Sequence, residues 1–329
     1  NSNPTDAIVM NRVARVNDIS ITSMDGMLSW AGVDGAVSYE VVMTSGDNTY
    51  TFTTSDTLID FETTLSDDSE RILAGDYNIE IRAVGDTMIT ARNTVSTNTF
   101  TKLAMVANIR IDETNPAAMT WDVVDGAQGY IVTFNYTNSA GDPLVVEQQI
   151  EGESNNSCVA PVGMTGQYSV TVQAIGVGYG YVFNGDSATF VSSKDRPNAV
   201  GAVMFDDTNY RYYWQTADDF GETDILRISY NFRPYIRSEA GNVVLSSTAT
   251  MVTVNIRYNQ SGAYFIEDGV RYYFYAPTEM GMITDFVVQV EREGSMYSDA
   301  SSGDDLNFNL FSYGAGTEDN PYRLDSADE

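Results

Sequence analysis

The sequence predicts an all-β protein made of three tandem β-sandwich modules. Three observations lead to this prediction: a long repeat, a two-residue hydrophobic period and regularly spaced turn residues. Trp30 and Trp121 lie 91 positions apart, and so do Tyr39 and Tyr130. This step exceeds the unit of a solenoid repeat, which is about 20–50 residues. It fits a β-sandwich of roughly 100 residues, so the repeat indicates duplicated domains.

The strands follow from the period of two. The segment GDYNIEIRAVG from Gly75 and the segment GQYSVTVQAIG from Gly166 both alternate apolar and polar residues. This alternation is typical of half-buried antiparallel strands. Turn-forming residues separate the runs, as in SGDN at 45–48, AGDP at 140–143 and EAGN at 239–242. No stretch holds a helical apolar period over three turns, so strands are expected almost throughout.

The third copy of the repeat carries an insertion. Trp121 precedes Tyr168 by 47 residues, whereas Trp214 precedes its counterpart Phe286 by 72. About 25 residues are therefore added before the later strand. The added stretch, within 252–275, has its own alternating runs and turn signals, and we interpret it as extra strands on one sheet.

These patterns divide the chain into three modules: module 1 at 12–101, module 2 at 102–195 and module 3 at 196–313. Residues 1–11 are interpreted either as the remnant last strand of a preceding module or as an ordinary N-terminal strand. Residues 314–329 form a boundary motif and an acidic tail, or simply a solvated tail. We expect the modules to lie end to end with short linkers.

Charge and cysteine content exclude several classes of partner. The chain carries a formal net charge of −29 and has a pI near 4.1. Such a surface repels phosphate backbones and anionic lipids, so we predict no nucleic-acid partner and no membrane contact from this segment. The single cysteine, Cys158, cannot form an intrachain disulfide. The sequence has no signal peptide and no membrane-spanning apolar run, so any signal or anchor is expected outside this chain.

The residue types argue against catalysis and against a dedicated metal site. The chain has no histidine, which excludes Ser-His-Asp and Cys-His mechanisms and histidine-ligated zinc. Glycoside hydrolysis needs two carboxyl groups about 5–10 Å apart across a cleft, which aspartate pairs on turns do not supply. No segment matches an EF-hand loop, so we predict no cofactor and leave calcium binding by acidic loops open. The aspartate pairs are Asp67–Asp68, Asp206–Asp207, Asp218–Asp219 and Asp304–Asp305.

Module 3 concentrates tyrosine and phenylalanine, and this makes it the candidate ligand-binding module. In the run from Arg271 to Tyr275, Tyr273 and Tyr275 share a strand face with Arg271, and we interpret this face as the more hydrated one. Exposed tyrosines beside an arginine stack on sugars or anchor a protein partner. We therefore predict a site at Tyr273, Tyr275 and Arg271, with Tyr258 as the nearest alternative. Cross-strand packing of these rings is the competing interpretation.

Three motifs carry a family resemblance. They are L-x-W ending at Trp30, with Met119 in place of the leucine in the copy that ends at Trp121, GA-x-x-Y ending at Tyr39 and Tyr130, and G-x-Y-x-[IV]-x-[IV]-x-A in the segments from Gly75 and Gly166. The modules resemble fibronectin type III domains of bacterial surface proteins, which are immunoglobulin-like β-sandwiches. The resemblance covers most of 12–313.

The resemblance implies a role for several of these residues. It implies that the tryptophans fill the cores. It also implies that Tyr77 and Tyr168 form tyrosine corners, with hydroxyls bonded to nearby backbone. Module 3 lacks GA-x-x-Y and has Phe286 in place of the corner tyrosine, so another immunoglobulin-like variant stays open there.

The tail GAGTEDNPYRL, from Gly314, resembles a G-x-GT-x-x-[DN]PY-x-[IL] segment found between domains of large bacterial surface proteins. The function expected from all of this is a non-enzymatic extracellular segment that acts as adhesion or spacer modules of a larger bacterial cell-surface protein. Its partner would be a protein or a glycan at the cell surface. The alternatives are a glycan-binding module and an accessory region of a polysaccharide-processing enzyme.

Overall fold

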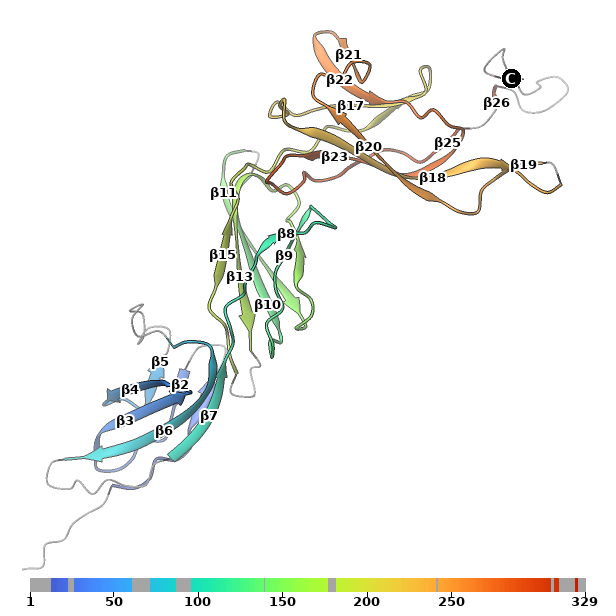
Figure 1. The fold of residues 1–329 in the computed structure, drawn as a ribbon. Helices are drawn as coiled ribbons and strands as arrows, with labels where there is room; N and C mark the ends of the chain where they lie inside the picture. The colour runs from blue at the N-terminus through green and yellow to red at the C-terminus, as the bar shows by residue number, and fades with distance from the viewer. Residues whose placement is uncertain are drawn as a thin grey trace, which may run out of the picture.

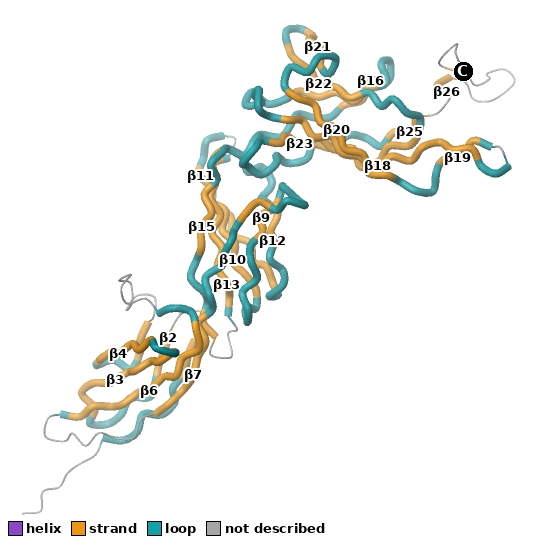
Figure 2. Tube along the Cα trace, viewed as in Figure 1, coloured by secondary structure: helices purple, strands orange, loops and turns teal. Residues whose placement is uncertain are grey.

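The computed structural model describes residues 13–22, 27–60, 72–86, 96–138, 140–176, 182–240, 242–308, 311–313 and 323–324. Every element in these ranges is a strand, which confirms the all-β prediction (Figure 2). The described segments form three bodies that follow one another in a bent row (Figure 1). The predicted strand within 1–11 lies outside the described residues, as does the tail 314–329 except Arg323–Leu324.

Module 1 is a sandwich of a three-stranded and a larger sheet. The first sheet has the order β1-β2-β5, and the second has the order β14-β7-β6-β3-β4, in which β14 comes from module 2. The bounds are β1 (Ser20–Thr22), β2 (Met27–Ser29), β3 (Ala36–Ser45), β4 (Asn48–Thr54), β5 (Leu58–Asp60), β6 (Gly75–Gly85), β7 (Ser96–Lys102) and β14 (Val182–Phe183).

Module 2 repeats this plan with three strands facing four. Its sheets have the orders β12-β9-β8 and β11-β10-β13-β15. The bounds are β8 (Arg110–Ile111), β9 (Ala118–Thr120), β10 (Gly129–Thr137), β11 (Pro143–Glu151), β12 (Ser157–Val159), β13 (Thr165–Ile175) and β15 (Ala188–Val191).

The L-x-W and GA-x-x-Y motifs work together in the cores of modules 1 and 2. The rings of Trp30 and Tyr39 pack edge to face with centroids 5.3 Å apart, and those of Trp121 and Tyr130 do the same at 5.3 Å. Each tyrosine hydroxyl also accepts a backbone N–H from six residues earlier, at 2.8 Å in module 1 and 3.0 Å in module 2. The buried hydroxyl is thereby satisfied, so the ring can fill the core without an unpaired polar atom.

Module 3 has four strands in one sheet. That sheet has the order β16-β17-β22-β21, and the other is built on β18 and β23. The bounds are β16 (Met204–Asp206), β17 (Arg211–Gln215), β18 (Ile225–Arg237), β19 (Val243–Leu245), β20 (Thr250–Arg257), β21 (Tyr264–Glu267), β22 (Val270–Tyr275), β23 (Gly281–Glu291), β24 (Ser301–Ser302) and β25 (Leu306–Phe308). A further pair, β26 (Phe311–Tyr313) and β27 (Arg323–Leu324), follows it.

The expectation that the inserted strands share one sheet is wrong. Strand β20 pairs with β18, whereas β21 and β22 pair with each other on the sheet of β17. The turn between β20 and β21 carries the chain from one sheet to the other. Tyr258 and Ala263 in this turn pack against the core between the sheets, and this packing fixes the crossing.

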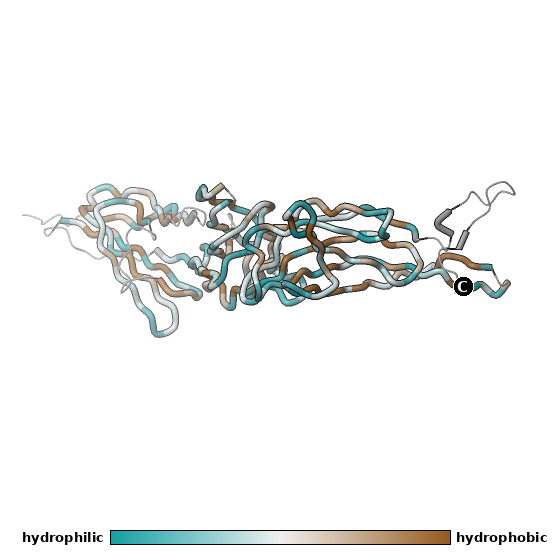
Figure 3. Tube along the Cα trace, turned by 90° about the horizontal axis from the view of Figure 1, so that it is seen from above, coloured by the Kyte–Doolittle hydropathy of each residue, from teal (hydrophilic) through white to brown (hydrophobic). Residues whose placement is uncertain are grey.

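Each module has its own hydrophobic core around one tryptophan: Trp30, Trp121 and Trp214. Viewed from above, apolar and polar residues are interleaved along the strands of all three modules, as alternating inward and outward positions require (Figure 3). Two of the cores also contain one side chain from the following module. These two side chains define the module junctions.

Candidate functional sites: two module junctions and the aromatic faces of module 3

The first junction is made by a loop of module 2 that lies against module 1. We call residues 182–187, between β13 and β15, plug loop A. Its strand β14 pairs in parallel with the end of β7, and so extends the sheet of module 1. The side chain of Phe183 is 4% exposed and lies in the core of module 1. Its ring packs edge to face on Phe100 with centroids 4.9 Å apart.

Polar contacts hold plug loop A in place. The N–H of Leu103 donates to the carbonyl O of Phe183 at 3.1 Å, and Lys102 Nζ lies 3.0 Å from Asp186 Oδ1. Gly185 sits so close to the linker that a Cβ there would collide with the backbone O of Ala104. The close approach therefore requires glycine at this position.

The second junction uses a loop of module 3 in the same way. We call residues 292–300, between β23 and β24, plug loop B. The side chain of Met296 has no exposed surface and belongs to the core of module 2. Its N–H donates to the hydroxyl of Tyr168 at 3.1 Å, and the N–H of Tyr297 donates to the carbonyl O of Pro116 at 2.9 Å. Plug loop A precedes β15 in module 2, and plug loop B precedes β24 in module 3. The two junctions are therefore built in the same way.

The role that the family resemblance implied for the corner tyrosines is correct for one of them. The hydroxyl of Tyr77 donates to the carbonyl O of Leu73 at 2.8 Å, which is a local tyrosine corner. The hydroxyl of Tyr168 instead accepts from Met296 of module 3. The difference arises because plug loop B brings a backbone donor to the end of module 2.

Arg196 lies in the linker between β15 and β16 and holds modules 2 and 3 together at the second junction. Its side chain is 1% exposed. Nε donates to the carbonyl O of Tyr297 at 2.7 Å, Nη1 to the carbonyl O of Met164 at 2.6 Å, and Nη2 to Asp299 Oδ1 at 2.9 Å. The other oxygen of Asp299 accepts the N–H of Gly163 at 2.6 Å. One guanidinium therefore ties the linker, module 2 and plug loop B together with charge-assisted hydrogen bonds.

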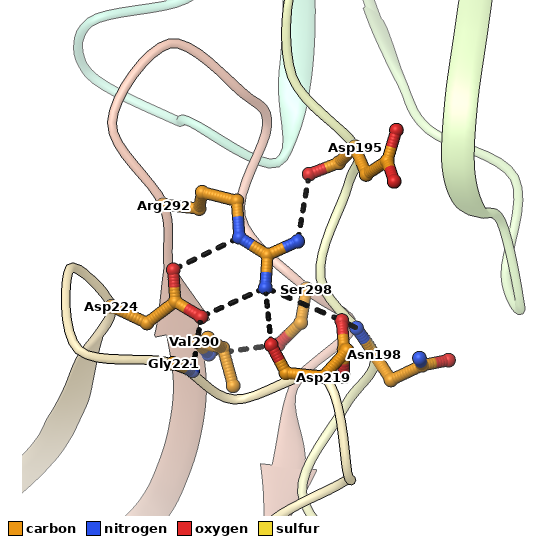
Figure 4. Close-up of polar contacts among 8 residues, drawn as sticks. All are labelled: Asp195, Asn198, Asp219, Gly221, Asp224, Val290, Arg292 and Ser298. Carbon is orange, nitrogen blue, oxygen red and sulfur yellow. Dashed lines mark hydrogen bonds and ion pairs between the residues drawn. The ribbon is translucent and has the colours of Figure 1, made fainter. Parts of the chain in front are cut away.

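Arg292, the first residue of plug loop B, holds the other side of this linker (Figure 4). Nε and Nη2 form a bidentate pair with the buried carboxylate of Asp224 at 2.9 and 2.8 Å. Nη2 also donates to the carbonyl O of Asp219 at 2.8 Å, and Nη1 to that of Asp195 in the linker at 3.2 Å. The hydrogen bond with Asp224 raises the pKa of the Arg292 guanidinium. The positive charge at this junction is thus permanent.

The structure reverses the face assignment in β22. Tyr273 has no exposed surface and lies in the module 3 core, and Tyr275 packs against the same core. The hydroxyl of Tyr275 lies 2.7 Å from that of Tyr230. The expectation that this is the more hydrated face is wrong, because Tyr273 lies opposite Trp214 in the pairing of β22 with β17 and faces the sandwich interior with it.

Two of the four predicted site residues lie together at the edge of module 3. The guanidinium carbon of Arg271 lies 5.3 Å from the ring centroid of Tyr258 and 4.6 Å from that of Tyr264. Nη1 of Arg271 donates to Asn259 Oδ1 at 2.6 Å. The sequence analysis did not predict Tyr264 as a site residue. The signal was available, because Tyr264 follows the turn at Ser261–Gly262 that also follows Tyr258.

Several partly exposed aromatic side chains of this sheet lie on its outer surface, whereas Tyr264 and Tyr275 pack against the core. We call Arg211, Tyr213, Phe265, Tyr272 and Phe274 the outer aromatic face. The guanidinium carbon of Arg211 lies 4.2 Å from the ring centroid of Phe265 and 4.9 Å from that of Phe274. The rings of Phe265 and Tyr272 stack with centroids 5.2 Å apart. These rings are half-buried by one another, so the face combines cross-strand packing with accessible aromatic surface.

The charge of Arg211 is balanced within this region. Its Nε lies 3.2 Å from Asp206 Oδ2. The hydrogen bond from the side chain of Asn209, with further ones that include Arg211, lowers the pKa of the Asp206 carboxyl. Arg211 and Asp206 thus form an ion pair without net charge beside the outer aromatic face.

Within the described ranges no group of three or more His, Cys, Asp or Glu side chains is placed to hold a metal ion. Asp67–Asp68 lies outside those ranges. No helix in the described part of the chain is long and apolar enough to cross a membrane.

Comparisons with known proteins find only distant similarity. No family model matches the chain, and no curated protein matches it. A solved structure of a two-domain fibronectin type III segment from chicken tenascin matches at 14% identity and a TM-score of 0.23, covering 54% of this chain and 95% of that one. The FN1–FN3 domains of chicken CNTN1 match at 12% identity and a TM-score of 0.25, covering 91% of this chain and 98% of that one.

Likeness at this level carries nothing about function. The class is defined by the strand order, in which three strands face four in modules 1 and 2. The described part of the chain is a tandem of three β-sandwiches joined by plug loops.

Proposed function

We propose that this chain is a non-enzymatic, stiff spacer in an extracellular protein of the bacterial cell surface, and that it presents module 3 to a partner. The observation that carries the proposal is the construction of the two junctions. Domains in tandem move relative to one another unless their interface is large and apolar. Here Phe183 and Met296 are buried in the preceding core, and each junction adds backbone hydrogen bonds.

The composition supports an extracellular spacer. A net charge of −29 keeps the surface soluble and repels neighbouring anionic surfaces. The orientation of modules 2 and 3 is held by Arg196 and Arg292, so the spacer needs no disulfide to keep that orientation across the second junction.

A length-matched exchange in the full surface protein tests the spacer role. Residues 12–195 are replaced either by an unrelated stiff tandem of the same length or by a flexible Gly/Ser segment of the same contour length. Adhesion of the cells is expected to survive the first exchange and to fall after the second. Equal adhesion with the flexible segment contradicts the spacer role. Labelling of intact cells by antibodies against module 3 tests the location, and labelling only after permeabilisation contradicts it.

The outer aromatic face favours one second candidate function, the binding of an uncharged glycan. Aromatic rings that are partly exposed and flanked by an arginine offer stacking surfaces for sugar rings. The pairing of Arg211 with Asp206 neutralises the one charged side chain among the five residues of this face. This candidate replaces Tyr273 and Tyr275 with Tyr272 and Phe274 as the contacting residues.

A glycan array probed with the full chain tests this second function. Binding that is lost in Tyr272→Ala and Phe274→Ala but kept in Tyr258→Ala assigns it to the outer face. Binding lost only in Tyr258→Ala moves the site to the Arg271 edge. An array with no binding excludes the glycan-binding function and does not affect the proposed spacer role.

A further inference from the structure

The contributions between modules run in one direction. The core of module 1 contains Phe183 of module 2, and the core of module 2 contains Met296 of module 3. The core of module 3 is formed by residues between Val200 and Leu306. Among the described residues, each of the first two cores is completed by the module that follows it, and neither later core contains a residue of an earlier module.

We propose that the modules are stabilised mainly in this direction, so that each module completes the one before it and loss of structure spreads from module 3 towards module 1. The proposal goes beyond the spacer function, because it concerns the isolated chain whatever module 3 binds. The row of three modules then has a direction of stabilisation, which a row of independent sandwiches does not have.

The consequences of opening module 3 follow from the contacts of plug loop B. Module 2 would lose Met296, and its core would keep a cavity or admit water. Tyr168 would lose the donor to its hydroxyl, and Arg196 would lose two of its three acceptors. Buried polar groups left without partners are strongly unfavourable, so module 2 becomes less stable as soon as module 3 opens.

The consequences of opening module 2 are smaller for module 3. The paired groups of Arg292 and Asp224 both belong to module 3 and keep each other. The side chain of Met296 would become exposed, which leaves the module 3 core unchanged because Met296 is no part of it. The coupling is therefore unequal in the two directions.

The chain carries one spectroscopic probe in each module. Its three tryptophans are Trp30, Trp121 and Trp214, each in a different core. None of their indole N–H groups has a hydrogen-bond partner among the residues that the structure describes. Replacing two of the three by phenylalanine leaves a full chain in which fluorescence reports the unfolding of a single module, without loss of a hydrogen bond.

The decisive variant is Met296→Ala in these three single-tryptophan backgrounds. The Trp121 midpoint of module 2 is expected to fall by at least about 8 °C, since removing a buried methionine side chain shifts a small domain by this much. The Trp214 midpoint of module 3 is expected to stay within about 3 °C, as for a surface change. A substitution in module 3 would thus destabilise module 2.

Three further measurements complete the test. Met251→Ala removes an exposed methionine from the same module and is expected to move neither midpoint. Phe183→Ala, in module 2, is expected to lower the Trp30 midpoint of module 1 by a similar amount. Under native conditions, Met296→Ala is expected to speed thiol labelling of Cys158, which is buried in the module 2 core.

The proposal is overturned if Met296→Ala lowers the Trp214 midpoint as much as the Trp121 midpoint, or leaves the Trp121 midpoint and the labelling rate unchanged. Should Met296→Ala leave module 2 unfolded at all temperatures while Trp214 still reports a folded module 3, the direction of the coupling is supported. In that case Met296→Leu, which conserves volume, is expected to restore most of the Trp121 midpoint.

Discussion

The N–H of Met296 lies 3.1 Å from the hydroxyl of Tyr168, a residue 128 positions earlier in the chain. In module 1 the equivalent tyrosine hydroxyl bonds to Leu73 in its own module. The same side chain therefore serves as a local corner in one sandwich and as part of a joint in the next.

Arg196→Ala is expected to lower the free energy of unfolding of module 2 by about 3 kcal/mol, because it leaves the Met164 carbonyl and the Asp299 carboxylate without their main partner. Urea denaturation followed at Trp121 measures this. Arg110→Ala is the matched control, because Arg110 forms an exposed pair with Asp122 and is expected to contribute less than about 1 kcal/mol. Equal effects of the two variants would refute the role of Arg196.

Tyr273→Ala and Tyr272→Ala, on adjacent positions of β22, are expected to differ sharply. Tyr273 is fully buried, so its truncation is expected to cost about 3–5 kcal/mol of module 3 stability. Tyr272 lies on the outer aromatic face, where the loss of cross-strand ring contacts is expected to cost about 1 kcal/mol or less. Denaturation of single-tryptophan chains that retain Trp214 compares them. A greater loss in Tyr272→Ala would show that the faces are assigned the wrong way round.

Cys158 provides a pH test of module 2. Burial raises the pKa of its thiol from 9.0 to about 11. Above pH 9 the unfolded state loses this proton while the folded state keeps it. The contribution of the protonated thiol to the stability of module 2 is therefore fully present below about pH 9. It is lost as the pH rises towards 11, by up to about 1.4 kcal/mol per pH unit. The readout is the difference between the wild type and Cys158→Ala across this range. Parallel curves for the two proteins would exclude the effect.

Removal of divalent cations is expected to leave all three unfolding midpoints unchanged. The cation at the second junction is the guanidinium of Arg292, and the described residues form no metal cluster. Thermal unfolding with chelator and with millimolar calcium tests this expectation. A midpoint that rises steadily with the logarithm of the calcium concentration would reveal a specific calcium site.

The sequence predicted the core residues wherever they stood in a repeated motif. The tryptophans and the GA-x-x-Y tyrosines stood in a repeat, and their pairing in the cores follows from it. The faces of β22 could not be assigned, because Tyr272, Tyr273, Phe274 and Tyr275 are all aromatic and give no alternation of polarity. Only the pairing with β17 decides which face is buried.

The plug loops were missed for a different reason. Phe183 and Met296 are large apolar residues in short, mainly polar loops, and their partners lie in the preceding module. No local period predicts such a contact. A large apolar residue in the mainly polar loop before the last strands of a repeat is the signal that could have found them.

The central claim is that plug loop B holds modules 2 and 3 in one fixed orientation. Pulsed electron paramagnetic resonance tests it most directly, with spin labels at the exposed positions Val145→Cys and Met251→Cys in a Cys158→Ala chain. The account predicts one narrow distance distribution, which broadens when Arg196→Gln and Arg292→Gln are combined. A broad distribution with both arginines present, or a narrow one that persists without them, would contradict it.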